Sequence, residues 1–115
     1  MSVKQLYEHV TIRVPLDTRR FIDYLNETLL ELSSLYNDFV FKPGEEGTVI
    51  ININQELPTR PPYFAAIVYN ILYLCGYDTN GTYKSEFIRL SQETNSRIKS
   101  NELRKKRHYI RRTGW

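Results

Sequence analysis

The fold is decided by the stretch PPYFAAIVYNILYLCG, residues 61–76, which contains the most apolar part of the chain. Large apolar residues recur there every three or four positions, as they do on the buried side of an α-helix: Phe64, Ile67, Val68, Ile71, Leu72 and Cys75. Pro61 and Pro62 suit the first turn of a helix, where a missing N–H group costs nothing, and Gly76 is placed to end it. We therefore expect a central core helix.

Two amphipathic segments precede this helix. In the longer one, Asp17 is a plausible N-cap, and the apolar residues that mark one face are Phe21, Ile22, Leu25, Leu29, Leu32 and Tyr36. The shorter one has helical spacing and stops at Pro15, with its apolar residues at Val3, Leu6, Tyr7, Val10 and Val14. Val10, Ile12 and Val14 also alternate as in a strand, but we expect a helix.

Between residues 39 and 54 the apolar period changes from near 3.6 to near 2. Two runs rich in β-formers, Phe39–Phe41 and Thr48–Asn54, flank a turn-like segment, and they predict a β-hairpin at about 39–54. Because a two-stranded hairpin alone is marginal in water, it should lie against the helices or pair with another copy of the chain. In the second case Val49, Ile51 and Ile53 are the candidate self-association residues.

The C-terminal part combines a last helix with a block of positive charge. A turn at 78–81 precedes a helical pattern that begins near Thr82 and loses its apolar face beyond about residue 96. Residues 97–115 hold eight Lys and Arg against one acid, a net +7, whereas residues 1–96 hold eight against twelve, a net −4. This basic extension, residues 97–115, is expected either to project as a helix about 28 Å long or to stay disordered until it meets a partner.

These patterns predict a mainly α fold: a four-helix bundle-like domain over residues 1–96, with a β-hairpin inserted between helices 2 and 3, followed by the basic C-terminal extension. A chain of 115 residues is long enough to bury a core as one domain. Its longest apolar stretch is shorter than the roughly 20 residues of a membrane span. A single cysteine, Cys75, makes no internal disulfide, so we expect a soluble protein in a reducing compartment.

Candidate catalytic groups are sparse. His9 and His108 lie at opposite ends of the sequence, and the glycines form no phosphate-binding loop. Asp23, Glu27 and Glu31 share one helix face and could hold a divalent cation, although a solvated face is the favoured interpretation. We expect no catalytic residue, no cofactor and no metal, and we expect Cys75 to be a small core residue.

The basic extension is the best candidate for a binding site. Its candidate partner-binding residues are Arg104, Lys105, Lys106, Arg107, Tyr109, Ile110, Arg111, Arg112 and Trp115. Basic residues interleaved with aromatic ones suit phosphate neutralisation and base stacking. The apolar residues among them favour docking on an acidic protein surface, and a merely solubilising extension is the third interpretation.

Five short sequence segments accompany the predicted order of two helices, a hairpin and two further helices: Phe21–Glu27, Val49–Ile53, Glu56–Pro58, Pro62–Leu72 and Tyr83–Phe87. Over most of Leu6 to Leu90 the chain resembles the small head–tail connector proteins of tailed bacteriophages, also called head-completion or adaptor proteins. The resemblance implies a non-enzymatic ring, with twelve subunits expected, that sits beneath the portal and extends the DNA channel to the tail.

The same resemblance implies a set of partners and a location. The partners would be other copies of the chain, the portal protein and a tail or stopper protein, with contact to packaged DNA and none to a membrane. The location would be the neck of the virion, and the host cytoplasm during assembly. In that family the C-terminal segment reaches the portal, and here that segment is the basic extension. The alternative is a small nucleic-acid-binding protein that grips phosphates with the same extension; a hydrolase or nuclease ranks below both.

Overall fold

The computed structural model describes residues 2–41, 49–76 and 81–114, with the side chains of residues 37, 38 and 106–114 excepted. Its elements are α1 (Val3–Thr11), α2 (Thr18–Val40), a short 3-10 helix η1 (Pro61–Tyr63), α3 (Phe64–Leu74) and α4 (Thr82–Gly114). Helix makes up 75% of the described residues, and four α-helices are found among them, so the prediction of a mainly α protein is confirmed.

The helices begin and end where local chemistry favours it. The Ser2 hydroxyl accepts a hydrogen bond from the Gln5 N–H, and the Gln5 side chain accepts one from the Ser2 N–H, a reciprocal cap that starts α1. The carboxylate of Asp17 accepts the Arg20 N–H at the start of α2, as expected. Gly76 follows the end of α3 with φ of +80°, a conformation that glycine adopts without steric cost.

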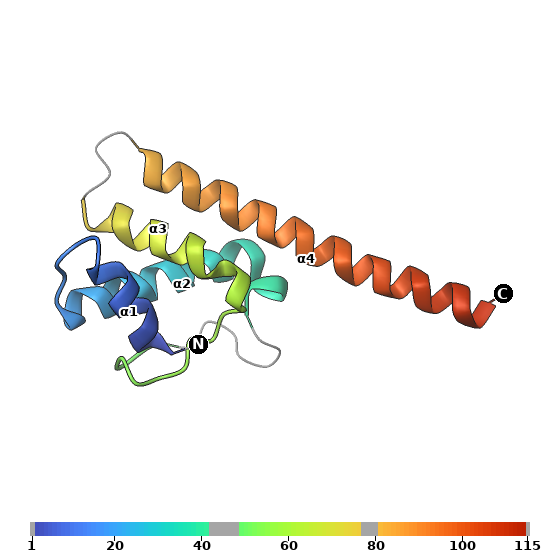
Figure 1. Cartoon of the computed structure of the whole chain (residues 1–115), viewed down its shortest axis with the longest axis horizontal. Coiled ribbons are helices and arrows are strands. Elements are labelled where there is room, and N and C mark those ends of the chain that lie inside the picture. The colour runs from blue at the N-terminus through green and yellow to red at the C-terminus, as the bar shows by residue number, and fades with distance from the viewer. Residues whose placement is uncertain (1, 42–48, 77–80, 115) are drawn as a thin grey trace.

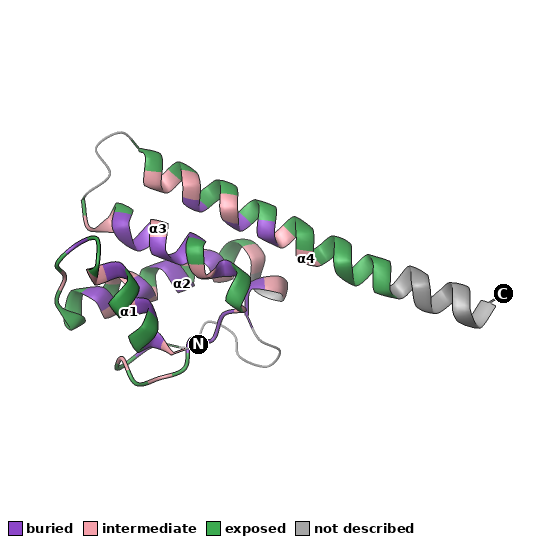
Figure 2. Cartoon of the chain, in the orientation of Figure 1, coloured by how far each residue is buried: buried purple, intermediate pink, exposed green. Residues whose placement is uncertain are grey.

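The core forms around α3, which packs against α1, α2 and α4 (Figure 1). The fully buried side chains include Phe21, Leu25 and Leu32 of α2, Ile67 and Ile71 of α3, and Phe87 of α4. In Figure 2 the buried residues line the inward faces of the helices, while exposed residues cover the outward faces. The expected apolar faces of these helices are therefore the buried ones.

The hairpin predicted at 39–54 is wrong for the residues that the structure describes. Phe39 and Val40 belong to the last turn of α2, and Val49 to Asn54 pair with no strand. The bridges found in the described part of the chain are single pairs, Ser2 with Glu56 and Phe41 with Thr59. The predicted turn, residues 42–47, and Thr48, the first residue of the predicted second strand, lie outside the described residues.

The physical reason for the missing hairpin is the hydrogen bonding of the Ile50 backbone. Its N–H donates to Oδ1 of Asn26 at 2.8 Å, and its C=O accepts from Nδ2 of Asn26 at 3.0 Å. A side chain of α2 thus replaces the partner strand. The period-2 pattern is real, because Ile50 is 2% exposed between two exposed neighbours, but it lies beside a helix and not in a sheet.

Helix α4 continues beyond the body of the protein (Figure 1). Ile98 is its last residue packed against the core, and residues 99–105 are all exposed. The backbone stays helical through Gly114, and the molecule measures 58 × 32 × 23 Å. Of the two alternatives for the basic extension, the structure therefore supports the projecting helix. Among the described helices, none has the length and apolarity needed to cross a membrane.

Candidate functional site

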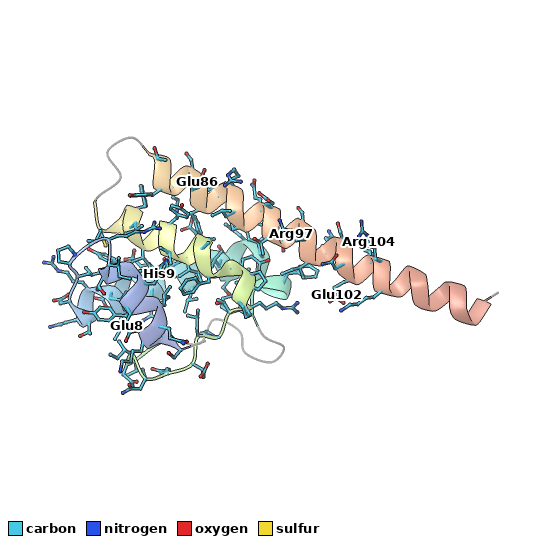
Figure 3. The ribbon with its side chains drawn as sticks, viewed as in Figure 1. Glu8, His9, Glu86, Arg97, Glu102 and Arg104 are labelled. Atoms are coloured by element: carbon cyan, nitrogen blue, oxygen red, sulfur yellow. The ribbon has the colours of Figure 1, made fainter. Side chains whose placement is uncertain are left out.

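The first candidate surface is the basic extension, whose residues from 99 to 114 continue α4 beyond the core (Figure 3). The side chains of Arg97 and Lys105 are 67% and 77% exposed, and Arg104 is also exposed. The other candidate residues from Lys106 to Arg112 stand on helical backbone, and their side chains lie outside the described residues, as does Trp115. The extension is helical through Gly114, and its described basic side chains, at 97, 99, 104 and 105, are exposed to solvent.

Ion pairs run along the outward face of α4 where the helix still lies on the body. Arg89 is 2.7 Å from Glu86 and 3.0 Å from Glu93, and Glu93 is 3.2 Å from Arg97. The hydrogen bond from Arg89 lowers the pKa of the Glu86 carboxyl, and that carboxylate raises the pKa of Arg89. Such pairs stabilise a helix in solvent, one turn after another.

This pairing ends at Glu102, which lies 4.0 Å from Lys105 and is the last acid in the sequence. Positive residues at a helix C-terminus interact favourably with the helix dipole, which helps the backbone to stay helical. The basic groups that follow have no acid in their own segment to pair with. Their charge is therefore available to a partner of opposite sign.

A second candidate surface, which we call the apolar surface, consists of Leu30, Val49 and Ile51. Their exposed fractions are 72%, 66% and 77%, which is high for large apolar side chains. Asn26 holds Ile50 against α2, so Val49 and Ile51 lie beside this helix, and Leu30 follows Asn26 by one turn. Of the three predicted self-association residues, Val49 and Ile51 are exposed, whereas Ile53 is half-buried against the core.

An open pocket of about 500 Å³ lies at the edge of the apolar surface. Its lining includes Ile22 and Asp23 of α2 together with Ile51 and Ile53. Leu30 was not among the predicted site residues. The signal that could have identified it is its place off the buried stripe of α2, since an apolar residue on a polar helix face needs another reason to be there.

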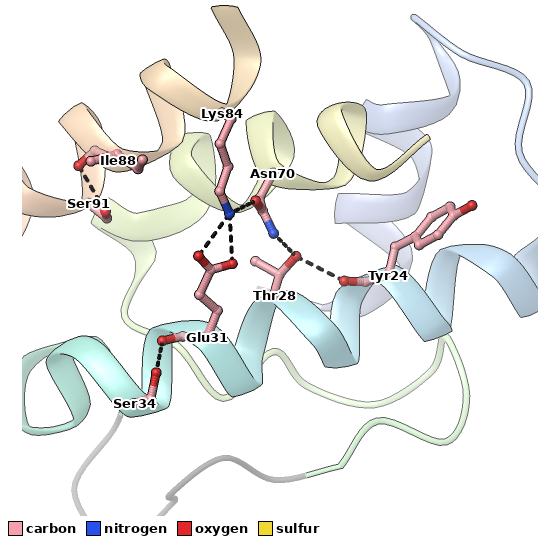
Figure 4. A network of polar contacts seen from close by, with 8 residues as sticks. All are labelled: Tyr24, Thr28, Glu31, Ser34, Asn70, Lys84, Ile88 and Ser91. Atoms are coloured by element: carbon pink, nitrogen blue, oxygen red, sulfur yellow. Dashed lines mark hydrogen bonds and ion pairs between the residues drawn. The ribbon is translucent and has the colours of Figure 1, made fainter. Parts of the chain in front are cut away.

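A polar cluster joins three helices on the inner side of α4 (Figure 4). Lys84 Nζ of α4 lies 3.1 Å from Asn70 Oδ1 of α3 and pairs with both carboxylate oxygens of Glu31 on α2. The amide of Asn70 donates to the hydroxyl of Thr28 at 2.8 Å, and both residues are buried. We call these four residues the polar clamp. It fixes the start of α4 and hence the direction in which the basic extension projects.

The clamp also decides between the two interpretations of the acidic ladder. Glu31 is paired with Lys84, while Asp23 and Glu27 are exposed on α2. No group of three or more His, Cys, Asp or Glu suited to a metal ion occurs in the described part of the chain. The solvated-face interpretation fits Asp23 and Glu27, and Glu31 has a structural partner.

Two further reactive side chains of the described residues, Cys75 and His9, have ordinary packing roles. Cys75 is half-buried at the end of α3, and burial raises the pKa of its thiol, which disfavours the reactive thiolate. The His9 ring packs edge-on against Phe64 with centroids 5.2 Å apart. Comparisons of the chain with protein-family models, with curated proteins and with solved structures found no match.

Proposed function

We propose that this protein is a structural subunit of a tailed bacteriophage: a head–tail connector that assembles as a ring beneath the portal and extends the DNA channel towards the tail. It works by occupying a place in the virion neck, and it catalyses no reaction. The observation that carries the proposal is the path of α4, which leaves the core after Ile98 and extends a basic helix away from the body.

The basic extension supports this role because it is built for contact outside its own fold. Its sequence holds eight basic residues against one acid, and it adds apolar side chains that a purely electrostatic contact would not need. In a connector these groups would meet the portal protein or line the channel near packaged DNA. The polar clamp would hold the helix at a constant angle, as identical subunits of a ring require.

The apolar surface supports the self-association that a ring demands. In a monomer three large apolar side chains are exposed to water, which is unfavourable in free energy. A neighbouring subunit that covered them would remove this unfavourable hydration. Their chemistry suits an interface core, where charged residues are depleted. Copies of this chain, the portal protein and a tail or stopper protein are the partners that this role requires.

Mixing the purified protein with its portal ring tests the proposal. Native mass spectrometry should find a complex with a defined number of copies per portal, with twelve expected. A variant with Arg104, Lys105, Lys106 and Arg107 changed to Ala should lose portal binding by at least tenfold. A wild-type protein that stays monomeric and unbound in the presence of its portal would exclude the connector role.

A second candidate function is a small nucleic-acid-binding protein, which the concentration of eight basic residues in residues 97–115 favours. If about six of them contact duplex DNA, the logarithm of the binding constant should fall with the logarithm of salt concentration with a slope of roughly −5. The connector role predicts little affinity for DNA in the isolated protein. Fluorescence anisotropy with a DNA duplex at several salt concentrations separates the two.

A further inference from the structure

The apolar surface has an acidic border. Asp23 and Glu27 are exposed on α2, and Glu27 lies one turn from both Asp23 and Leu30. Asp23 lines the same pocket as Ile51, and so does Arg19, one turn before Asp23, so two carboxylates stand against one guanidinium there. Exposed carboxylates thus stand next to exposed Leu30, Val49 and Ile51. A segment that fits this area would combine a large apolar side chain with positive charges.

The first half of the basic extension has that composition. Leu103 is 50% exposed and is followed directly by Arg104 and Lys105, both exposed. Arg97 and Lys99, which are also exposed, precede it by one to two turns. Glu102 is the single acid of residues 97–105, which carry four basic residues and hence a net charge of +3. One apolar anchor in a segment of net positive charge is complementary to an apolar area with an acidic border.

The two areas do not meet within one molecule. Helix α4 packs against the body as far as Ile98 and then runs away from it without a break. In Figure 1 the segment that contains Val49 and Ile51, coloured green, is part of the body of the protein, whereas the C-terminus lies at the far end of the projecting α4. Complementary areas at opposite ends of one chain produce head-to-tail contacts between copies, which close into rings when the rotation permits.

We propose that Asp23, Glu27 and the apolar surface of one copy receive residues 97–105 of the next copy. Leu103 packs against Leu30, Val49 and Ile51, while Arg104 and Lys105 lie beside Asp23 and Glu27. The inference rests on the proposed function, since it identifies the contact between neighbours that would build the ring. Residues 106–115 then extend past the neighbour, towards the portal or DNA.

Cysteine cross-linking tests the contact directly. In a background with Cys75→Ser, one preparation carries Leu103→Cys and the other carries Ile51→Cys, so a disulfide forms only between different chains. The control partner is Ile12→Cys, because Ile12 is an equally exposed apolar residue, at 82%, outside the proposed contact. On oxidation of the mixtures, with and without the portal ring, we expect at least tenfold more cross-linked dimer with Ile51→Cys. Equal yields for the two partners in both conditions would overturn the proposal.

A charge exchange provides the second test. One variant carries Asp23→Lys and Glu27→Lys, and the other carries Arg104→Glu and Lys105→Glu. Each alone should lose at least tenfold in self-association, measured by sedimentation or on the portal ring, and an equimolar mixture should recover it. Circular dichroism checks that each variant is folded. A mixture that associates no better than its components, although wild type associates, would exclude this contact.

The outcomes separate the inference from the proposed function. If the ring forms on the portal but neither test affects it, the connector role stands and this contact is wrong. If copies cross-link through Leu103 and Ile51 but never bind a portal, the contact stands and the connector role is wrong. If the surface instead receives the portal protein, the portal protects Ile51→Cys from thiol modification while no dimer cross-link forms, which also overturns the proposal.

Discussion

The ammonium group of Lys84 lies 2.8 Å and 2.9 Å from the two carboxylate oxygens of Glu31, and this contact joins α4 to α2 across 53 positions of the chain. The same ammonium group faces the rings of Phe87 and Tyr73, with 4.7 Å and 5.3 Å to the ring centroids. Both side chains are only partly exposed, so solvent screens the pair less than a surface pair. Since α4 carries the basic extension, this pair helps to set where the extension points.

Replacing Lys84 by Met should lower the free energy of unfolding by about 1–2 kcal/mol, because Glu31 would keep its charge and lose its main partner. Urea unfolding followed by circular dichroism measures the change. Arg89→Met is the matched control on the same helix: its pairs are solvent-exposed, so the expected change in the free energy of unfolding is close to zero. Equal costs for the two substitutions would contradict a special role of the clamp.

Thr28→Val should cost about 1–3 kcal/mol, because the Thr28 hydroxyl accepts a hydrogen bond from the buried amide of Asn70 and valine leaves that donor unsatisfied. Thr11→Val is the control. The Thr11 hydroxyl donates to the carbonyl oxygen four residues before it, at 3.0 Å, but among the described residues it accepts no hydrogen bond from a buried donor. Thermal or urea unfolding should therefore show a clearly larger loss for Thr28→Val.

Tyr63→Phe should stabilise the protein by about 1 kcal/mol, because the buried Tyr63 hydroxyl finds no hydrogen-bond partner among the described residues. Burial also raises the pKa of Tyr63 to about 12, with Arg60 acting in the opposite direction. The unfolded chain, with an ordinary tyrosine pKa near 10, releases this proton first, so wild type loses stability as the pH rises from about 10 to 12.

The stability advantage of the Tyr63→Phe variant over wild type should therefore widen between about pH 10 and pH 12. Comparing unfolding curves of the two proteins at matched pH cancels the contribution of the other eight tyrosines. An advantage that stays constant over this range would show that the hydroxyl titrates normally in the folded state.

Asn26→Ala should loosen the segment that carries Val49 and Ile51. The substitution removes both hydrogen bonds to the backbone of Ile50, whose side chain is buried, at a cost of about 1–2 kcal/mol. Hydrogen exchange should report faster exchange of the Ile50 amide, with α3 amides changed much less. Asn101→Ala, at an exposed position of α4, is the control, and it should leave both stability and exchange unchanged.

Residues 39–54 are the part of the chain where the predicted and the observed structures differ. The run of β-formers at 48–54 predicted a strand, and burial does alternate over residues 49–51. The pairing partner, however, is the amide of Asn26, which lies 24 positions away. Nothing in a local pattern distinguishes a strand held by another strand from an extended segment held by a helix side chain, because both bury alternate residues.

Apolar periodicity determined the helices and the buried faces of α2 and α3. Capping residues determined the start of α2 at Asp17 and the end of α3 at Gly76, and composition determined the concentration of positive charge after residue 96. These properties are local, since they depend on residues within one or two helical turns. Only the tertiary structure decided that Glu31 meets Lys84, that Leu30, Val49 and Ile51 stay exposed, and that α4 leaves the body after Ile98. Those properties depend on which helix faces pack together, because burial and pairing across dozens of residues are set by contacts that no short segment contains.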